Sequence, residues 1–161
     1  MLVKGIIDTD IVNYKKISMT IEFPFCSFKC DKECGRAVCQ NSPLINEPNI
    51  DISYDDICKR YLNNPITEAI VCQGLEPLDS DSPFDIMALL TFLRIKYNRD
   101  DDFVIYTGYN KNEIEDWIID SLKNFGNVII KYGRYIPDQE PHYDEVLGVN
   151  LASDNQYAER L

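Results

Sequence analysis

The residues of this 161-residue chain that could carry out chemistry are concentrated in one short segment. Four of the six cysteines lie within fourteen consecutive positions, at Cys26, Cys30, Cys34 and Cys39. Thiolates are soft ligands, and a loop with three or four of them can bind zinc or an iron–sulfur cluster. Charged residues surround these cysteines, so the segment is a poor candidate for the hydrophobic core. We therefore predict a metal site here.

The spacing of the cysteines bears on which metal they bind. A structural zinc site usually takes two close pairs of ligands with a longer segment between the pairs. Only three residues would separate the pair Cys26 and Cys30 from the pair Cys34 and Cys39, which is cramped for two zinc knuckles. An iron–sulfur cluster that keeps one iron free for another ligand needs three thiolates. Cys26 and Cys30 supply two of them, and the spacing leaves both Cys34 and Cys39 open as the third.

The composition is that of an acidic globular protein. Hydrophobic residues make up 45% of the chain and charged residues 27%, which predicts a single domain over residues 1–161. The 27 Asp and Glu outnumber the 16 Lys and Arg, for a formal charge of -11. This balance argues against a nucleic acid partner, because phosphate backbones bind clustered cations. The apolar runs are too short to span a membrane and the first residues are charged, so we expect a cytoplasmic protein without membrane contact.

Hydrophobic periodicity predicts strands that alternate with helices. Residues 18–25 alternate strictly between apolar and other side chains, which predicts a strand with one buried face. The predicted strands are 18–25, 69–72, 103–107, 127–132 and 146–149, and the predicted helices are 53–62, 84–97 and 114–125. This order implies βαβ units and an α/β fold with a largely parallel sheet. Cys58 and Cys72 fall on such a helix and strand, and we predict that they are packing residues.

Three loops follow the carboxyl ends of predicted strands and contain residues of functional type. They are the cysteine segment 26–39, the segment 73–77 and the segment 107–109. Ligands of open α/β sheets bind at the carboxyl ends of the strands, so we expect the three loops to face one cavity. Gln73, Glu76 and Thr107 would then lie beside the cysteines, and Gly74 would permit a close approach of the backbone.

The cysteine segment resembles the cluster loop of a known family. Cys26-Ser27-Phe28-Lys29-Cys30, followed by Cys39-Gln40-Asn41, is similar to the loop of radical S-adenosylmethionine enzymes, and more narrowly to the activating enzymes of anaerobic (class III) ribonucleotide reductases. In that family the third cysteine is often followed by an aromatic residue, His or Gln and then Asn. The resemblance therefore implies Cys39 as the third ligand. The eight residues between Cys30 and Cys39 depart from the family interval of two, and Cys34 remains the competing third ligand.

The resemblance extends over most of the chain. Four further segments match the family in the same order and at compatible separations. They are 10–13 before the first strand, 73–77 as a Gly-Gly-Glu-Pro loop with Leu75 in place of the second glycine, 106–109 with a Thr-Gly-Tyr element, and 152–156 with a Ser-x-Asn-Gln signature. Each match is weak by itself, but their common order is hard to obtain by chance.

The resemblance implies a fold and two cofactors. The fold would be a truncated, open, partial parallel βα barrel of the radical S-adenosylmethionine type, with the cluster loop at residues 26–41. Cys26, Cys30 and Cys39 would hold a 4Fe-4S cluster, and S-adenosyl-L-methionine would bind its free iron. Gln73, Gly74, Glu76 and Thr107 would contact that cofactor, with Glu76 and the backbone near Gly74 on the methionine ammonium. No catalytic side chain beyond the cluster ligands is expected, since the cofactors perform the chemistry.

By the same resemblance, the protein would be a radical S-adenosylmethionine oxidoreductase that activates a glycyl-radical enzyme. It would cleave S-adenosylmethionine reductively and generate a glycyl radical on the large subunit of an anaerobic ribonucleoside-triphosphate reductase. Its second partner would be an electron donor such as a flavodoxin. Two alternatives stay open at this point. One is a small radical enzyme acting on a small molecule, similar to 7-carboxy-7-deazaguanine synthase, and the other is a zinc-stabilised interaction module without enzymatic activity.

Overall fold

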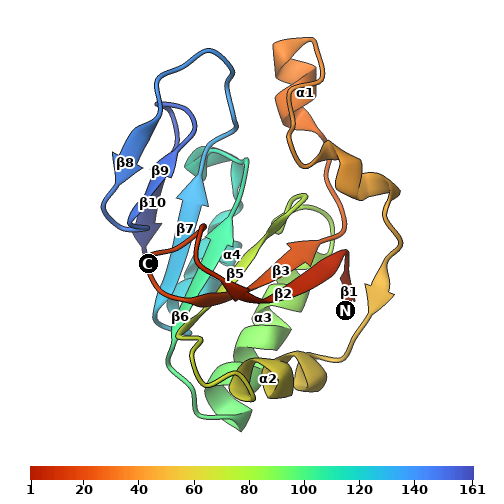
Figure 1. Cartoon of the computed structure of the whole chain (residues 1–161), viewed down its shortest axis with the longest axis vertical. Helices are drawn as coiled ribbons and strands as arrows, with labels where there is room; N and C mark the ends of the chain where they lie inside the picture. The colour runs from red at the N-terminus through yellow and green to blue at the C-terminus, as the bar shows by residue number, and fades with distance from the viewer.

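A computed structural model describes all 161 residues and shows a mixed α/β fold around one central sheet (Figure 1). The sheet has six strands in the order β10-β7-β6-β5-β3-β2. Their bounds are β2 Gly5–Asp10, β3 Ser18–Phe23, β5 Ala69–Gly74, β6 Asp102–Tyr106, β7 Val128–Tyr132 and β10 Tyr157–Arg160. Two small two-stranded sheets accompany it, β1 Leu2–Val3 with β4 Ile50–Asp51 and β8 His142–Asp144 with β9 Val149–Leu151.

Four α-helices connect or flank these strands. They are α1 Lys29–Cys34, α2 Tyr54–Leu62, α3 Ser82–Thr91 and α4 Asp116–Lys123. A π-helical turn, η2 Phe92–Lys96, extends α3, and short 3-10 helices lie at η1 Ser42–Asn46 and η3 Lys111–Glu113. None of the helices combines the length and the apolar character that crossing a bilayer requires.

The four strands in the middle of the sheet are parallel, as the βαβ pattern predicted. The neighbouring pairs β3 and β5, β5 and β6, and β6 and β7 all run parallel. Both outer strands are antiparallel to their neighbours, β2 to β3 and β10 to β7, and the periodicity did not predict either of them. The predicted α/β class is confirmed. The prediction of a strand at 146–149 is wrong. The strand in this region, β9, begins only at Val149, and it pairs with β8 outside the central sheet.

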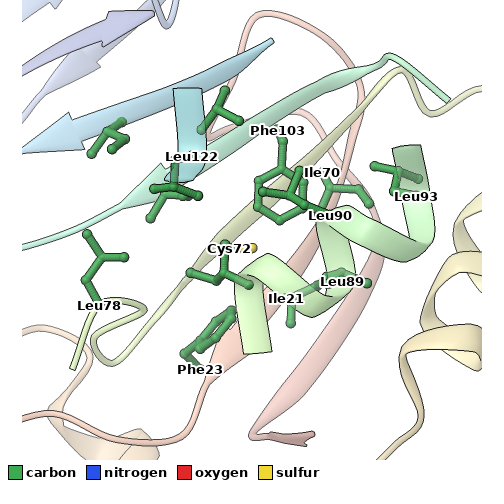
Figure 2. Close-up of a cluster of buried hydrophobic side chains, with 14 of the residues drawn as sticks. Ile21, Phe23, Ile70, Cys72, Leu78, Leu89, Leu90, Leu93, Phe103 and Leu122 are labelled. Carbon is green, nitrogen blue, oxygen red and sulfur yellow. The ribbon is translucent and has the colours of Figure 1, made fainter. Parts of the chain in front are cut away.

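The larger core lies between the sheet and the helices α2, α3 and α4. Alternate residues of the parallel strands point into it, among them Ile21, Ile70 and Phe103, where they meet helix residues such as Leu89 (Figure 2). The sheet and helix side chains in this cluster are almost completely excluded from solvent. Cys58 and Cys72 are fully buried there, which confirms that they are packing residues. Burial of this apolar area is the main favourable term in folding.

The opposite face of the sheet is also covered. Tyr14, Leu147 and Leu151 pack there on alternate apolar residues of β5, β6 and β7. The prediction that residues 18–25 form a strand with one buried face is therefore wrong, since Ser18 and Thr20 are fully buried as well. The segment after β2 folds back over this face, and the Thr20 hydroxyl donates a 2.7 Å hydrogen bond to the Asp10 carboxylate. Near the carboxyl ends of the strands, the same face borders a cavity.

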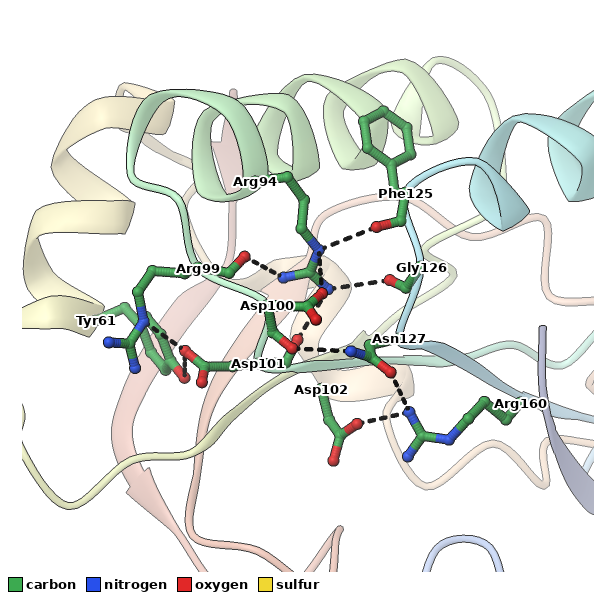
Figure 3. A network of polar contacts seen from close by, with 10 residues as sticks. All are labelled: Tyr61, Arg94, Arg99, Asp100, Asp101, Asp102, Phe125, Gly126, Asn127 and Arg160. Atoms are coloured by element: carbon green, nitrogen blue, oxygen red, sulfur yellow. Dashed lines mark hydrogen bonds and ion pairs between the residues drawn. The ribbon is translucent and has the colours of Figure 1, made fainter.

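A polar network closes the amino-terminal edge of the sheet (Figure 3). The buried Asp102 carboxylate lies 2.6 Å from the Lys16 ammonium and 2.7 Å from the Arg160 guanidinium, and it accepts a 2.9 Å hydrogen bond from the Tyr14 hydroxyl. Burial by itself would raise the pKa of Asp102, but these hydrogen bonds outweigh it and lower the pKa to about 2. The guanidinium of Arg94 donates to backbone carbonyls in the same region, including that of Asp101 at 2.8 Å.

We predict that Asp102→Asn lowers the free energy of unfolding by about 1–2 kcal/mol at pH 7. The carboxylate has a lower pKa in the folded chain than in the unfolded chain, so its contribution is complete above pH 4 and is lost as the pH falls through about 2. Urea unfolding at pH 7 and at pH 3 measures this. Asp120→Asn, at a side chain that is 74% exposed, is the control and should change little. A difference between wild type and Asp102→Asn that does not shrink towards pH 2 would contradict the prediction.

Candidate functional site

The three loops predicted to converge do meet, at the carboxyl ends of the parallel strands. They border a cavity of about 430 Å³, a volume typical of small-molecule sites. All residues predicted as cluster ligands or cofactor contacts line this cavity, apart from the competing ligand Cys34. These lining residues are Cys26, Cys30, Cys39, Gln73, Gly74, Glu76 and Thr107. The structure thus brings the predicted residues together, while their roles remain predictions.

The course of the cysteine loop explains why Cys39 and not Cys34 lines the cavity. Cys30 lies in the first turn of α1 and Cys34 is the last residue of that helix, which carries it away from the cavity. The chain then turns back, and one oxygen of the Asp31 carboxylate accepts hydrogen bonds from the amides of Val38 at 2.8 Å and Cys39 at 2.9 Å. The eight intervening residues therefore form a closed excursion that starts and ends at the cavity.

The three cavity-lining thiols interact electrostatically. They are half-buried and form no disulfide. Burial raises the pKa of Cys26 to about 12, and the charges of Glu76, Cys30 and Cys39 add to the rise. Burial also raises the pKa of Cys30, as does the charge of Cys39, and burial together with the charge of Asp31 raises the pKa of Cys39. Three thiolates in this poorly solvated space repel one another, so a bound cation is needed to stabilise them.

The Glu76 carboxylate joins the loop after β5 to the loop after β6. It is only 4% exposed and accepts hydrogen bonds from the Thr107 hydroxyl at 2.7 Å, the Gly108 amide at 2.7 Å and the Leu78 amide at 3.0 Å. Burial raises the pKa of Glu76, although these hydrogen bonds oppose the rise. A Cβ atom at Gly108 would lie 3.4 Å from Glu76 Oε2 and 3.8 Å from Cys30 Sγ. Glu76 and Cys30 therefore lie close together across Gly108.

Gly74 is the residue that lets the loop after β5 lie against β3. Its φ of +94° is in the left-handed region, and a Cβ atom there would lie 2.9 Å from both the Glu22 Cα and the Phe23 amide nitrogen. Its carbonyl accepts a 2.6 Å hydrogen bond from the Asn41 side chain. This bond connects the end of the cysteine loop to the predicted cofactor loop.

Lys131 is a cavity residue that the sequence reasoning missed. It is only 7% exposed, and its ammonium donates a single hydrogen bond to protein, to the Gly133 carbonyl at 2.8 Å. Burial lowers the pKa of Lys131 to about 8, while the charges of Glu76 and Cys30 oppose this fall. Its signal in the sequence was a lone cation in the otherwise apolar strand β7. A buried ammonium with unused donors on a cavity wall suits the anionic group of a ligand.

The first and last segments of the family resemblance also border the cavity. Asn13 lines it, and its carbonyl accepts a 2.5 Å hydrogen bond from the Tyr106 hydroxyl. Gln156 lines it too, and its side chain donates to the Gly133 carbonyl at 3.2 Å and accepts from the Ser153 amide at 3.2 Å. Segments far apart in the sequence are therefore joined around one space.

The helix α1 is held to the rest of the molecule by charge. It projects from the body of the fold and buries none of its residues (Figure 1). The buried Arg134 guanidinium donates two hydrogen bonds to the Glu113 carboxylate, at 2.5 and 2.6 Å, and lies 3.2 Å from the Glu33 carboxylate of α1. Lys29 in turn lies 3.4 Å from Glu113. Sequence reasoning did not identify Arg134, because its partners are distant in the chain.

The arrangement of the cysteines around the cavity bears on whether they suit a single zinc ion or an iron–sulfur cluster. No three Cys, His, Asp or Glu side chains converge as ligands of a single ion. In an iron–sulfur cluster each thiolate binds a different iron, so the ligands surround the cluster rather than meet at one point. Three thiols around one cavity, each able to bind iron as a thiolate, are chemically suited to a cluster with one iron left open.

Searches against models of protein families, curated proteins and solved structures found no match for this chain. A proposal for its function therefore depends on the cavity, its lining residues and the sequence motifs.

We predict that Gly74→Ala destabilises the protein by at least about 1–2 kcal/mol, because alanine disfavours a positive φ and its Cβ would collide with β3. Gly126→Ala is the matched control, since Gly126 also has a positive φ of +69° but no atom near its Cβ position. Urea unfolding should show the larger loss for Gly74→Ala. Equal losses for the two variants would show that the contact with β3 is unimportant.

Proposed function

We propose that this protein is a radical S-adenosylmethionine activating enzyme that generates a glycyl radical on an anaerobic ribonucleoside-triphosphate reductase. One observation carries the proposal. Cys26, Cys30 and Cys39 come from a single loop and line one cavity with Glu76, whereas Cys34 does not line it. The Cys39-Gln40-Asn41 motif favours the same three ligands. The hydrogen bond from the Cys39 amide to Asp31 brings Cys39 back beside Cys30, although eight residues separate the two cysteines.

The fold supports the proposal in two respects. Four parallel strands, β3, β5, β6 and β7, are connected through helices that pack on one face of the sheet. The cavity lies on the other face, at the carboxyl ends of these strands. We infer that the sheet is the truncated, open βα barrel of the radical S-adenosylmethionine type, with β2 and β10 as its edges.

The cavity residues provide ligands for both cofactors. Cys26, Cys30 and Cys39 would hold a 4Fe-4S cluster with one iron free for S-adenosylmethionine. When bound, these two cofactors supply one-electron cleavage of the sulfonium and abstraction of a hydrogen atom from a glycine of the reductase. Glu76 would accept from the methionine ammonium, and the Lys131 ammonium would donate to its carboxylate.

The chain itself orients these groups and limits water. Thr107 and the Gly108 amide fix the Glu76 carboxylate, and Gln73 and Gly74 form the wall beside it. Gln156 forms part of the cavity wall from the C-terminal segment. A buried, preorganised wall of this kind protects reactive species from solvent. An electron donor such as a flavodoxin would supply the reducing equivalent.

Two other functions are separated from this one by simple measurements. A zinc module would be colourless, because zinc has a filled d shell, whereas iron–thiolate clusters absorb visible light. An enzyme acting on a small molecule would also form 5′-deoxyadenosine, but it would generate no glycyl radical on the reductase. The decisive experiment is anaerobic reconstitution with iron and sulfide, followed by dithionite reduction in the presence of S-adenosylmethionine. We expect a brown protein that forms 5′-deoxyadenosine, and a glycyl radical when the reductase is added.

We predict that Cys→Ala substitution at 26, 30 or 39 abolishes cluster binding, and that Cys34→Ala retains it, because Cys34 does not line the cavity. Iron quantitation and the visible spectrum after anaerobic reconstitution measure the outcome. Cys58→Ala, in the hydrophobic core, is a second control that should keep the cluster. Loss of iron in Cys34→Ala with retention in Cys39→Ala would overturn the ligand assignment.

We predict that Lys131→Met weakens S-adenosylmethionine binding by roughly 10–100-fold, as expected for one lost charge-assisted hydrogen bond. Calorimetric titration of the reconstituted protein measures the dissociation constant. Decarboxylated S-adenosylmethionine is the matched ligand, and wild type and Lys131→Met should bind it equally. Equal weakening for both ligands would show that Lys131 does not bind the carboxylate.

A further inference from the structure

An aromatic groove lies between the N-terminal ends of α3 and α4. We define this groove by Leu78, Pro83, Phe84, Ile114, Trp117 and Ile118, and its volume is about 250 Å³. The rings of Phe84 and Trp117 stack across it with their centroids 5.4 Å apart.

The two aromatic rings are poorly covered by the fold. Phe84 is 59% exposed and Trp117 is 41% exposed, although Ile114 and Ile118 beneath them are nearly buried. Stacked aromatic side chains at the surface above an apolar floor are typical of protein–protein contacts, where such residues act as energetic anchors. No other part of the folded chain covers the exposed faces of these two rings.

The groove lies at the same edge of the sheet as the cysteine cavity. The helices α3 and α4 follow β5 and β6, so their N-terminal ends lie where those strands end. Lys29 and Tyr109 line the groove, and they also line a small cleft that contains Cys26 and Cys30. A macromolecule that covers this edge of the molecule therefore reaches both the groove and the cysteine loop.

The exposed side chains around the groove are mainly acidic, which favours a partner with positive charge. Lys29 and Glu113 lie 3.4 Å apart and compensate each other. The exposed acids Asp81, Glu115 and Asp116 flank the aromatic residues in sequence and form no ion pair with this chain. The whole chain carries a formal charge of -11. Charge complementarity therefore favours a partner segment with cations beside an apolar anchor.

We propose that the aromatic groove is the docking site for the protein substrate, and that it binds an apolar side chain flanked by Lys or Arg on the reductase. This inference rests on the function proposed above. The groove would anchor the reductase at a distance from the reacting glycine, which leaves the cysteine cavity free for the cofactors. Binding at the groove and cleavage of S-adenosylmethionine are then separable properties of the protein.

The single tryptophan makes the groove directly observable. Protein labelled with 5-fluorotryptophan gives one fluorine resonance, from Trp117, even when unlabelled reductase from the same organism is present. We expect titration with that reductase to shift or broaden this resonance. Phe84→Ser should weaken binding about tenfold or more, and Asp81→Asn with Asp116→Asn should weaken it several-fold at low salt. Ile95→Ser, at a residue that is 75% exposed in η2, is the matched control and should bind like wild type.

The outcomes separate this inference from the proposed function. If Phe84→Ser keeps its cluster and forms 5′-deoxyadenosine at the wild-type rate but loses affinity for the reductase, both proposals hold. If the reductase binds without changing the Trp117 resonance, or binds Phe84→Ser as tightly as wild type, the docking site is wrong and the proposed activity stands. A resonance that shifts with the protein's own concentration would assign the groove to a second copy and would also overturn the inference. A wild-type protein that forms no 5′-deoxyadenosine would instead refute the proposed function.

Discussion

The contact between the Asp31 carboxylate and the amides of Val38 and Cys39 determines the course of the cysteine loop. One oxygen accepts both hydrogen bonds, so the chain that leaves with α1 must return beside Cys30. Hydrogen bonds to a charged acceptor are stronger than neutral ones, and these two close an excursion of eight residues. The identity of the third cavity-lining cysteine follows from this local geometry rather than from spacing in the sequence. Without that return, the cavity would have two thiols on its wall, which is too few for the proposed cluster.

A second constraint is the set of polar side chains buried around the cavity. Glu76 and Lys131 are nearly inaccessible to solvent, and burying charged groups is costly unless they are paired. Glu76 is compensated by three hydrogen bonds from neighbouring loops, whereas Lys131 makes a single one. The Glu76 carboxylate is therefore held in place and keeps room for one further donor, whereas most donors of the Lys131 ammonium lack a partner in the protein. This asymmetry indicates where the anionic group of a bound molecule would supply the missing acceptor.

The sequence predicted the parallel strands, the helices between them and the convergence of their loops, because these features depend on local periodicity and on general rules of α/β sheets. It did not predict β2 and β10, since neither segment shows a clear apolar alternation and both are stabilised by pairing with β3 and β7. It also missed Arg134, whose role depends on residues brought near by the tertiary fold. The predicted cofactor residues all line the cavity because their loops had to leave the same edge of the sheet.

The weak attachment of α1 has a consequence for how the protein matures. This helix buries no residue, and the side chains that it contributes to ion pairs with the body, Lys29 and Glu33, are both substantially exposed, so each pair contributes little to stability. The sheet and its two hydrophobic cores therefore do not depend on α1 for their burial, and we expect α1 to open more readily than the rest of the fold. Iron and sulfide would then reach the cysteines of an already folded protein while α1 is open. Under the proposed function, assembly of the cluster would be a late, separate step, unlike in the small zinc domains that acquire their fold only when the metal binds.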